Sequence, residues 1–136
     1  MSLLLVRHAW AGDSEKWDGD DRVRPVDDRG RKQSEGLIDV LAGFAVDRIV
    51  SSPYLRCIQT VEPLAEARGL DIELDDALGA DRLEDVPQVL EGLQGENAVV
   101  CTHGDLPWLE DRKFKKGSTW VLNGDLEPRR YIKPLA

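Results

Sequence analysis

The hydrophobic pattern of the chain alternates between short apolar runs and longer segments with helical spacing. The short runs have the length of β-strands and occupy residues 3–6, 48–51, 71–74 and 97–102. The longer segments repeat apolar residues at i, i+3, i+4 and i+7, which predicts helices over about 27–42, 54–68 and 85–93. A last pair of strands, 118–122 and 129–132, is expected to be antiparallel around Asn123-Gly124. Strands that alternate with helices predict an α/β fold with a mostly parallel central sheet and helices on both faces.

Acidic residues and one proline refine the helix boundaries. Asp27 or Asp28 is suited to cap the first helix, and Asp85 to cap the third. Pro63 lies inside the second helical pattern, where it is expected to kink that helix or split it in two. Residues 9–26 are rich in Gly, Asp and Arg without periodicity, and this predicts a long loop after the first strand.

Length and charge limit the class of protein. With 136 residues the chain is expected to form one domain, residues 1–136, whose core needs no metal or disulfide. Eighteen Lys and Arg against 26 Asp and Glu give a formal net charge of −8, which disfavours nucleic acid or an anionic membrane as the main partner. Cys57 and Cys101 lack a CxxC spacing and indicate reduced thiols in a cytoplasmic protein. The apolar run at 3–6 is too short for a signal peptide or a membrane span.

Basic and imidazole side chains follow three of the predicted strands. Arg7 and His8 come directly after the first strand, Arg56 begins the helix after the second, and His103 follows the strand at 97–102. Ligands of open α/β sheets bind outside the carboxyl ends of the parallel strands. Both histidines of the chain and two arginines are therefore expected at one edge of the sheet.

These residue types together are suited to phosphoryl transfer. A neutral imidazole is a nucleophile that can attack phosphorus and become a phosphoramidate. Arginine offers a planar fork of donors that matches a phosphate, and fixed cations stabilise the negative charge of the transition state. A second, protonated imidazole would add a further donor, so this chemistry requires no metal and no cofactor.

The segments around these residues resemble the histidine phosphatase superfamily, the phosphoglycerate mutase-like enzymes. The resemblance is strongest to the short SixA-type phosphohistidine phosphatases, and it spans nearly the whole chain. The end of the chain is also similar to the phosphatase domain that follows a Nudix hydrolase domain in some bacterial proteins. The segments that carry these similarities are residues 5–9, 24–30, 51–60, 101–104 and 116–122.

The resemblance implies a role for each residue at the sheet edge. His8 would be the nucleophile that becomes phosphorylated, and Arg7, Arg56 and His103 would complete the phosphate pocket. The reaction would have two steps, transfer of the phosphoryl group to His8 and then attack by water. Ala9 departs from the glycine that is usual after the histidine of this motif.

Two further roles stay open at this point. Arg24 is a candidate to reach the phosphate from its loop, but a salt bridge to Asp27 or Asp28 would explain it equally well. The chain is too short for the insertion in which longer relatives carry a glutamate acid. The acidic loop at 75–84 offers Asp81 and Glu84 as candidate general acids instead.

The missing acid favours substrates whose leaving group departs with little protonation. The expected partner is a phosphorylated small molecule, a nucleotide or a phosphohistidine protein, with phosphohistidine and nucleoside polyphosphates preferred over sugar monophosphates. A non-catalytic phosphate-binding or phosphoprotein-binding module with the same pocket is one alternative. A metallohydrolase that uses His8 and His103 is another, although the chain has no HxH or HExxH spacing.

A basic run and several tryptophans near these motifs have two interpretations. The run at 112–116 is either a solvated loop or a contact for the distal phosphates of a nucleotide or for an acidic protein surface. Trp10 and Trp17 either pack over the loop after His8 or line a substrate cleft, whereas Trp120 is expected in the core.

Overall fold

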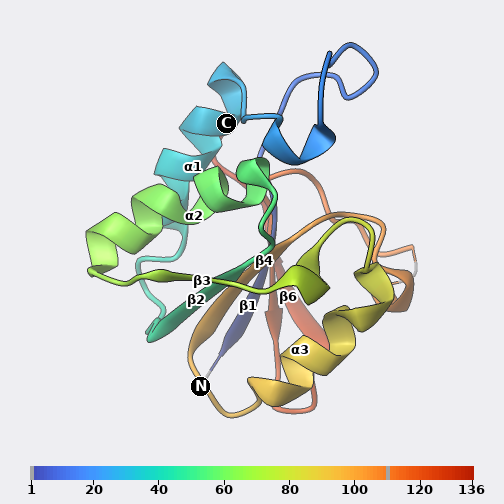
Figure 1. Ribbon diagram of the computed structural model, residues 1–136. Helices are drawn as coiled ribbons and strands as arrows, with labels where there is room; N and C mark the ends of the chain where they lie inside the picture. Colours follow the sequence, from blue (N-terminus) through green and yellow to red (C-terminus); the bar gives the residue numbers. More distant parts are fainter. Residues whose placement is uncertain (1, 110) are drawn as a thin grey trace.

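The computed structural model describes residues 2–109 and 111–136, which form a six-stranded sheet between helices (Figure 1). The strands in spatial order are β3 (Ile72–Leu74), β2 (Arg48–Ser51), β4 (Ala98–Thr102), β1 (Leu3–Arg7), β5 (Thr119–Leu122) and β6 (Pro128–Ile132). The first four are mutually parallel, and β5 and β6 add an antiparallel pair beside β1. The predicted α/β fold with a mostly parallel sheet is therefore confirmed.

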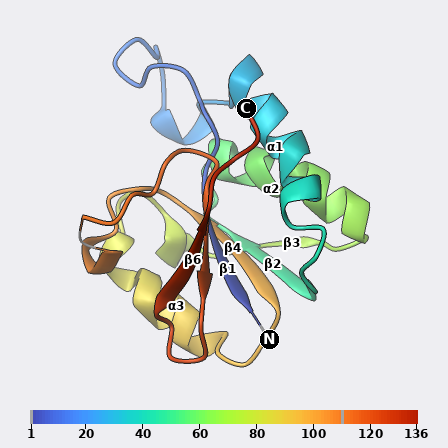
Figure 2. The same ribbon diagram turned by 180° about the vertical axis from the view of Figure 1, so that it is seen from behind.

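Three α-helices cover the sheet. Helices α1 (Asp28–Val40) and α2 (Leu55–Arg68) pack together on one face, and α3 (Val86–Gly92) packs on the other, as the two opposite views show (Figures 1 and 2). Short 3₁₀ turns at Asp21–Val23, Asp76–Leu78, Leu83–Asp85 and Pro107–Leu109 lie within the connecting loops. In both views the C-terminal end of the chain lies beside α1.

Alternation along β1 explains why the sheet is covered on both faces. Leu4 and Val6 belong to the apolar cluster under α1 and α2, whereas Leu3 and Leu5 belong to the cluster under α3. All four side chains are buried. Successive strand residues point to opposite faces, so a continuous apolar run requires a layer on each side. The interior position of β1 follows, and it places the residues after β1 at the middle of the sheet edge.

The predicted cap of α1 is present, whereas α2 is not divided at its proline. Asp27 caps α1, because its Oδ1 accepts the backbone N–H of Gly30 at 2.8 Å. Of the two outcomes expected at Pro63, a kink or a split, the split is wrong: α2 is one helix of 14 residues with the proline inside it. Val61 and Leu64 on either side of Pro63 are fully buried in the core, and this packing outweighs the lost backbone hydrogen bond.

The remaining helix boundaries differ from the predictions in two details. Asp85 precedes α3 but makes no capping hydrogen bond with its side chain. Its carboxylate instead accepts from the guanidinium of Arg82 at 3.0 Å. Helix α1 ends at Val40, before the expected residue 42. Among residues 2–109 and 111–136, no helix has both the length and the hydrophobicity that crossing a bilayer requires.

Candidate active site

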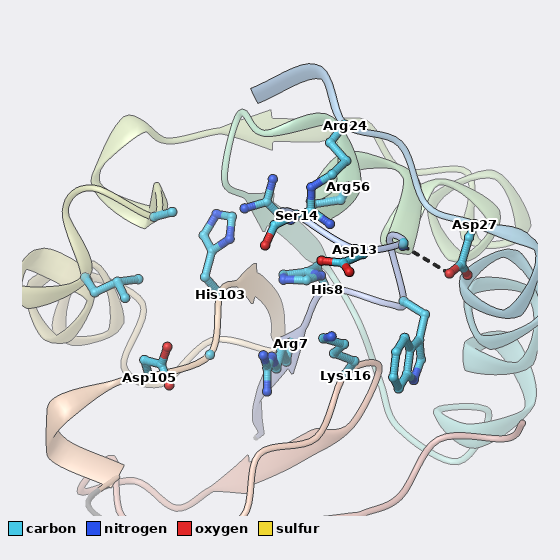
Figure 3. A pocket seen from close by; sticks show the side chains of 15 residues that line it. Arg7, His8, Asp13, Ser14, Arg24, Asp27, Arg56, His103, Asp105 and Lys116 are labelled. Atoms are coloured by element: carbon cyan, nitrogen blue, oxygen red, sulfur yellow. Dashed lines mark hydrogen bonds between the residues drawn. The ribbon is translucent and has the colours of Figure 1, made fainter. Parts of the chain in front are cut away.

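A cavity of about 610 Å³ opens at the carboxyl edge of the parallel strands (Figure 3). The structure brings the five residues expected to bind or attack the phosphate into its lining: Arg7, His8, Arg24, Arg56 and His103. These residues come from the end of β1, the loop after it, the first turn of α2 and the end of β4. Their convergence follows from the parallel pairing of β1 with β4 and of β4 with β2.

His8 is held as a neutral ring with one nitrogen committed to the backbone. Its Nδ1 lies 2.8 Å from the carbonyl oxygen of Ala9, so Nδ1 carries the hydrogen and Nε2 keeps its lone pair. The side chain is 5% exposed. Burial, together with the charges of His103, Arg56 and Arg7, lowers the pKa of His8 to about 3, although the Ala9 carbonyl acts in the opposite direction. An unprotonated Nε2 is the form that a nucleophile needs.

Backbone hydrogen bonds fix the segment that carries this ring. The amide of His8 donates to the carbonyl of Thr102 at 3.0 Å, and the amide of Ala9 donates to Thr60 Oγ1 at 2.8 Å. Ala9 is fully buried and does not adopt a positive φ. The departure from glycine at this position is therefore accommodated without backbone strain.

His103 faces His8 and is held from behind by a hydroxyl and a thiol. The two ring centroids are 5.4 Å apart, with the rings inclined at 60°. Nε2 of His103 lies 3.0 Å from Ser52 Oγ and 3.6 Å from Cys57 Sγ, and Tyr54 packs edge-on against the ring. Within the described part of the chain, Nδ1 of His103 is buried and has no hydrogen-bond partner. That nitrogen remains available to a ligand.

Arg7 depends on a glycine for its position. Its Nη1 donates to the carbonyl of Phe114 at 2.7 Å. A Cβ at Gly104 would lie 2.5 Å from Arg7 Cζ, closer than van der Waals contact allows. The residue after His103 must therefore lack a side chain if the guanidinium is to lie where it does.

Arg24 and Arg56 share one carboxylate, that of Asp21. Arg56 donates through Nη1 and Nη2 to the backbone oxygen and to Oδ2 of Asp21, at 2.9 and 3.0 Å. Arg24 Nε donates to Oδ1 of the same residue at 3.0 Å, and its Nη1 donates to the carbonyl of Ala11. Burial raises the pKa of Asp21, but the two arginines outweigh it and hold that pKa below its usual value.

The salt-bridge partner expected for Arg24 is therefore wrong. The partner is Asp21 in the 3₁₀ turn and neither Asp27 nor Asp28. Both oxygens of Asp27 already accept backbone N–H groups, those of Gly30 and Gly12. Arg24 nevertheless lines the cavity, so the salt bridge and the position beside a ligand are compatible.

The two candidate acids from the loop at 75–84 do not line this cavity. Asp81 and Glu84 are exposed, and Asp81 borders a different hollow. Among the residues that the structure describes, the carboxylates that do line it are Asp13, Asp27 and Asp105. Asp105 follows the His103-Gly104 motif by one residue, and this adjacency is the signal by which the sequence could have pointed to it.

Part of the basic run at 112–116 and one of the two tryptophans after His8 lie at the cavity, and the other tryptophan does not. Lys116 and Trp10 line the cavity, with Lys116 Nζ 4.2 Å from the centroid of the Trp10 ring. Burial and the nearby charges of Arg7 and Arg24 lower the pKa of Lys116. Trp17 is 37% exposed and lies outside the lining of this cavity.

Two other expectations concern buried residues. Trp120 is only partly buried, and its indole nitrogen donates to the carbonyl of Lys113 at 2.8 Å. Cys57 and Cys101 are free and fully buried, as expected for reduced thiols. Among the described residues, no group of three or more His, Cys, Asp or Glu is placed to hold a metal ion.

The sequence pattern of the histidine phosphatase superfamily (branch 1) matches residues 3–80, more than half of the chain. The chain belongs to this superfamily. The 8-oxo-(d)GTP phosphatase of Mycolicibacterium smegmatis is 36% identical to this histidine phosphatase over 156 aligned residues, covering 98% of the chain and 48% of the relative. The chain thus spans about half the length of that curated relative.

Solved structures agree with the fold of this histidine phosphatase. SixA from Agrobacterium tumefaciens superposes with a TM-score of 0.80 at 21% identity, over 98% of this chain and 97% of that one. The protein histidine phosphatase SixA complexed with tungstate gives a TM-score of 0.77 at 22% identity, over 100% of this chain and 97% of that one. The short, SixA-like form of the phosphoglycerate mutase fold is therefore confirmed.

Proposed function

We propose that this histidine phosphatase hydrolyses phosphorylated substrates through a phosphohistidine formed on His8. In the first step, the lone pair of Nε2 attacks phosphorus while the bond from phosphorus to the leaving group breaks. The electron pair of that bond leaves with the oxygen of a phosphate ester or phosphoanhydride, or with the imidazole nitrogen of a phosphohistidine. In the second step, water attacks the phosphohistidine, which releases orthophosphate and a proton and restores the neutral ring. The observation that carries this proposal is the buried His8, whose Nδ1–H is bound to Ala9 and whose Nε2 is unprotonated.

Arg7, Arg56 and His103 would hold the phosphoryl group during both steps. Each has one buried nitrogen that finds no hydrogen-bond partner among the described residues: Arg7 Nε, Arg56 Nε and His103 Nδ1. Buried donors of this kind are normally satisfied, and a phosphate oxygen would satisfy them. Fixed cationic donors stabilise the charge on the equatorial oxygens without the reorganisation that water requires. No step in this scheme uses a metal or a cofactor.

The substrate would be a nucleotide with linked phosphates or a phosphohistidine protein. The relative from Mycolicibacterium smegmatis, named as an 8-oxo-(d)GTP phosphatase, supports the first class. The solved protein histidine phosphatase SixA supports the second. A cytoplasmic location is part of the proposal, because Cys57 and Cys101 are both free thiols.

Rapid quenching of the chain with substrate labelled on the terminal phosphate tests the intermediate. We expect a protein-bound label that survives alkali and is lost in acid, the stability of a phosphoramidate. His8→Asn should abolish the label. His103→Gln is the matched control, because it replaces the imidazole of His103 by an uncharged amide and leaves the nucleophile, so labelling should slow but persist.

The other outcomes of this experiment separate the alternatives. Phosphate binding without any label, across nucleotides, phosphohistidine protein and an aryl phosphate, would support a binding module instead. Turnover that disappears after exhaustive chelation would support a metallohydrolase. We expect full turnover after chelation.

A further inference from the structure

A second hollow of about 340 Å³ lies beside the cavity. Figure 3 labels Arg7 and Lys116, which border both spaces. The two spaces share three lining residues, namely Arg7, Trp10 and Lys116. The others that border the second hollow come from α1, the loop before β5 and the C-terminal segment: Arg29, Gln33, Lys115 and Pro134. We call this hollow the annex. The shared lining places the annex next to the cavity, so that a group attached to a phosphate at His8 has the annex as a neighbouring site.

The annex concentrates unpaired positive charge in a chain with a net charge of −8. Arg29, Lys115 and Lys116 form no ion pair with any residue that the structure describes. Within the described residues, no carboxylate lies at ion-pair distance from these three cations, although Asp13 and Asp27 of the adjoining cavity act on Lys116 from farther away. The charge is therefore available to an anion from solution.

The Trp10 ring organises two of these cations. Arg29 Cζ lies 4.4 Å and Lys116 Nζ 4.2 Å from the ring centroid, both within cation–π distance. The π surface of the indole is thus already used by protein cations. This arrangement favours an anionic group over a stacked base as the occupant of the annex.

The walls of the annex are held together by one side chain. Gln33 accepts the backbone N–H of Trp10 through Oε1 at 3.0 Å and donates through Nε2 to the carbonyl of Lys116 at 3.1 Å. A Cβ at Gly30 would lie 1.9 Å from the carbonyl oxygen of Trp10, and a Cβ at Gly117 would lie 2.9 Å from the Gln33 amide. Gln33 is 3% exposed. The annex is therefore a preformed structure, built by close packing of α1 against two loops.

We propose that the annex binds the second phosphate of a substrate whose terminal phosphate lies at His8, so that the preferred substrates are di- and triphosphates. This inference rests on the proposed function for the placement of the terminal phosphate. The reaction would transfer the terminal phosphoryl group to His8 and leave the shortened phosphate chain, with the electron pair of the broken bond, in the annex. Arg29, Lys115 and Lys116 neutralise the charge that develops on that leaving group, which replaces part of the work of a general acid.

Binding of a non-hydrolysable diphosphate tests the annex without requiring turnover. The probes are methylenediphosphonate and orthophosphate, titrated calorimetrically into the whole chain without added metal. The test variant is Arg29→Gln combined with Lys115→Gln, because neither residue lines the His8 cavity. The control is Arg31→Gln, an exposed arginine on the same helix that borders a different hollow with Glu35 and Glu62.

We expect the test variant to lose about tenfold or more in affinity for the diphosphonate, the effect of removing charged hydrogen-bond donors. Its affinity for orthophosphate should change less than twofold, and Arg31→Gln should leave both affinities unchanged. Equal losses for both probes, or an equal loss in the Arg31 variant, would mean a general charge effect and would overturn the proposal. An unchanged diphosphonate affinity would do the same.

A kinetic measurement distinguishes a failure of the annex from a failure of the proposed function. The ratio of kcat/KM for a nucleoside diphosphate to that for an aryl phosphate should fall about tenfold in the test variant. If His8 is labelled but this ratio is unchanged, the annex proposal alone is wrong. If no label forms but the diphosphonate selectivity is present and depends on Arg29 and Lys115, the annex stands and the phosphohistidine mechanism fails.

Discussion

Acidification should destabilise the fold through His8, and the structure indicates by how much. The pKa of His8 is lowered to about 3 in the folded chain, whereas an exposed histidine has its usual value of about 6.5. Between these two values the unfolded chain binds a proton that the folded chain excludes. The free energy of unfolding therefore falls as the pH falls through this window, and the contribution of His8 is fully present only above the upper value.

The size of this contribution follows from the width of the window. Each pH unit below the unfolded pKa removes about 1.4 kcal/mol, so His8 accounts for a loss of about 2 kcal/mol between pH 7 and pH 5. The side chain is 5% exposed, so little of this effect is lost to solvent screening. The variant His8→Asn removes the titrating ring and keeps a donor for the Ala9 carbonyl.

Urea unfolding of both proteins at pH 5, 6 and 7, in buffer without phosphate, isolates the effect. All other titrating groups are common to the two chains and cancel in the difference. We expect the wild type to lose about 2 kcal/mol more than His8→Asn over this range. Parallel curves would refute the reasoning, since they would mean that the folded chain accepts a proton on His8 as readily as the unfolded one.

Other side chains of the site give three further predictions. Gly104→Ala should lower kcat/KM by roughly 10²-fold, because the added Cβ displaces the Arg7 guanidinium. The control Gly92→Ala, which has open space at its Cβ, should leave kcat/KM unchanged. Equal kcat/KM values for the two variants would contradict a steric clash between residue 104 and Arg7. We take Asp105, which lines the cavity, as the candidate general acid in place of Asp81 and Glu84. Asp105→Asn should then slow hydrolysis of an alkyl phosphate about tenfold or more and that of an aryl phosphate much less, and equal slowing would exclude this role. Asp21→Ala should reduce the free energy of unfolding, measured in urea, by about 1–3 kcal/mol, because the guanidinium groups of Arg24 and Arg56 lose the carboxylate that accepts from both. An unchanged free energy of unfolding would show that water replaces this carboxylate.

The hydrophobic pattern predicted the strands and the edge where the chemistry collects. The continuous apolar run from Leu3 to Val6 required cover on both faces, and this placed β1 in the interior of the sheet. Once β1, β2 and β4 were parallel, Arg7, His8 and His103 had to meet at their carboxyl ends. Arg56 joined them because the helix that begins after β2 starts at the same edge.

Features that depend on loop conformation or on tertiary packing were not predictable in this way. The partner of Arg24 is set by a 3₁₀ turn that local composition does not specify, so Asp21 could not be told apart from other nearby carboxylates. Pro63 was expected to kink or split α2 because intrinsic propensity opposes proline there, but buried neighbours keep α2 a single helix. The annex joins Arg29 of α1 to Lys116, far along the sequence, through contacts that no local pattern contains.

The hydroxyl of Ser52 can hold the His103 ring in place whichever ring nitrogen carries the hydrogen. Ser52 Oγ accepts the backbone N–H of Tyr54 at 3.2 Å and keeps one hydrogen and one lone pair for His103 Nε2. It can donate to a bare Nε2 or accept from an Nε2 that bears a hydrogen, without rotation of either side chain. With Nε2 as the acceptor, the ring hydrogen of the neutral form lies on Nδ1, the nitrogen left without a partner. The ring can therefore keep its orientation toward His8 whichever of its two nitrogens carries the hydrogen.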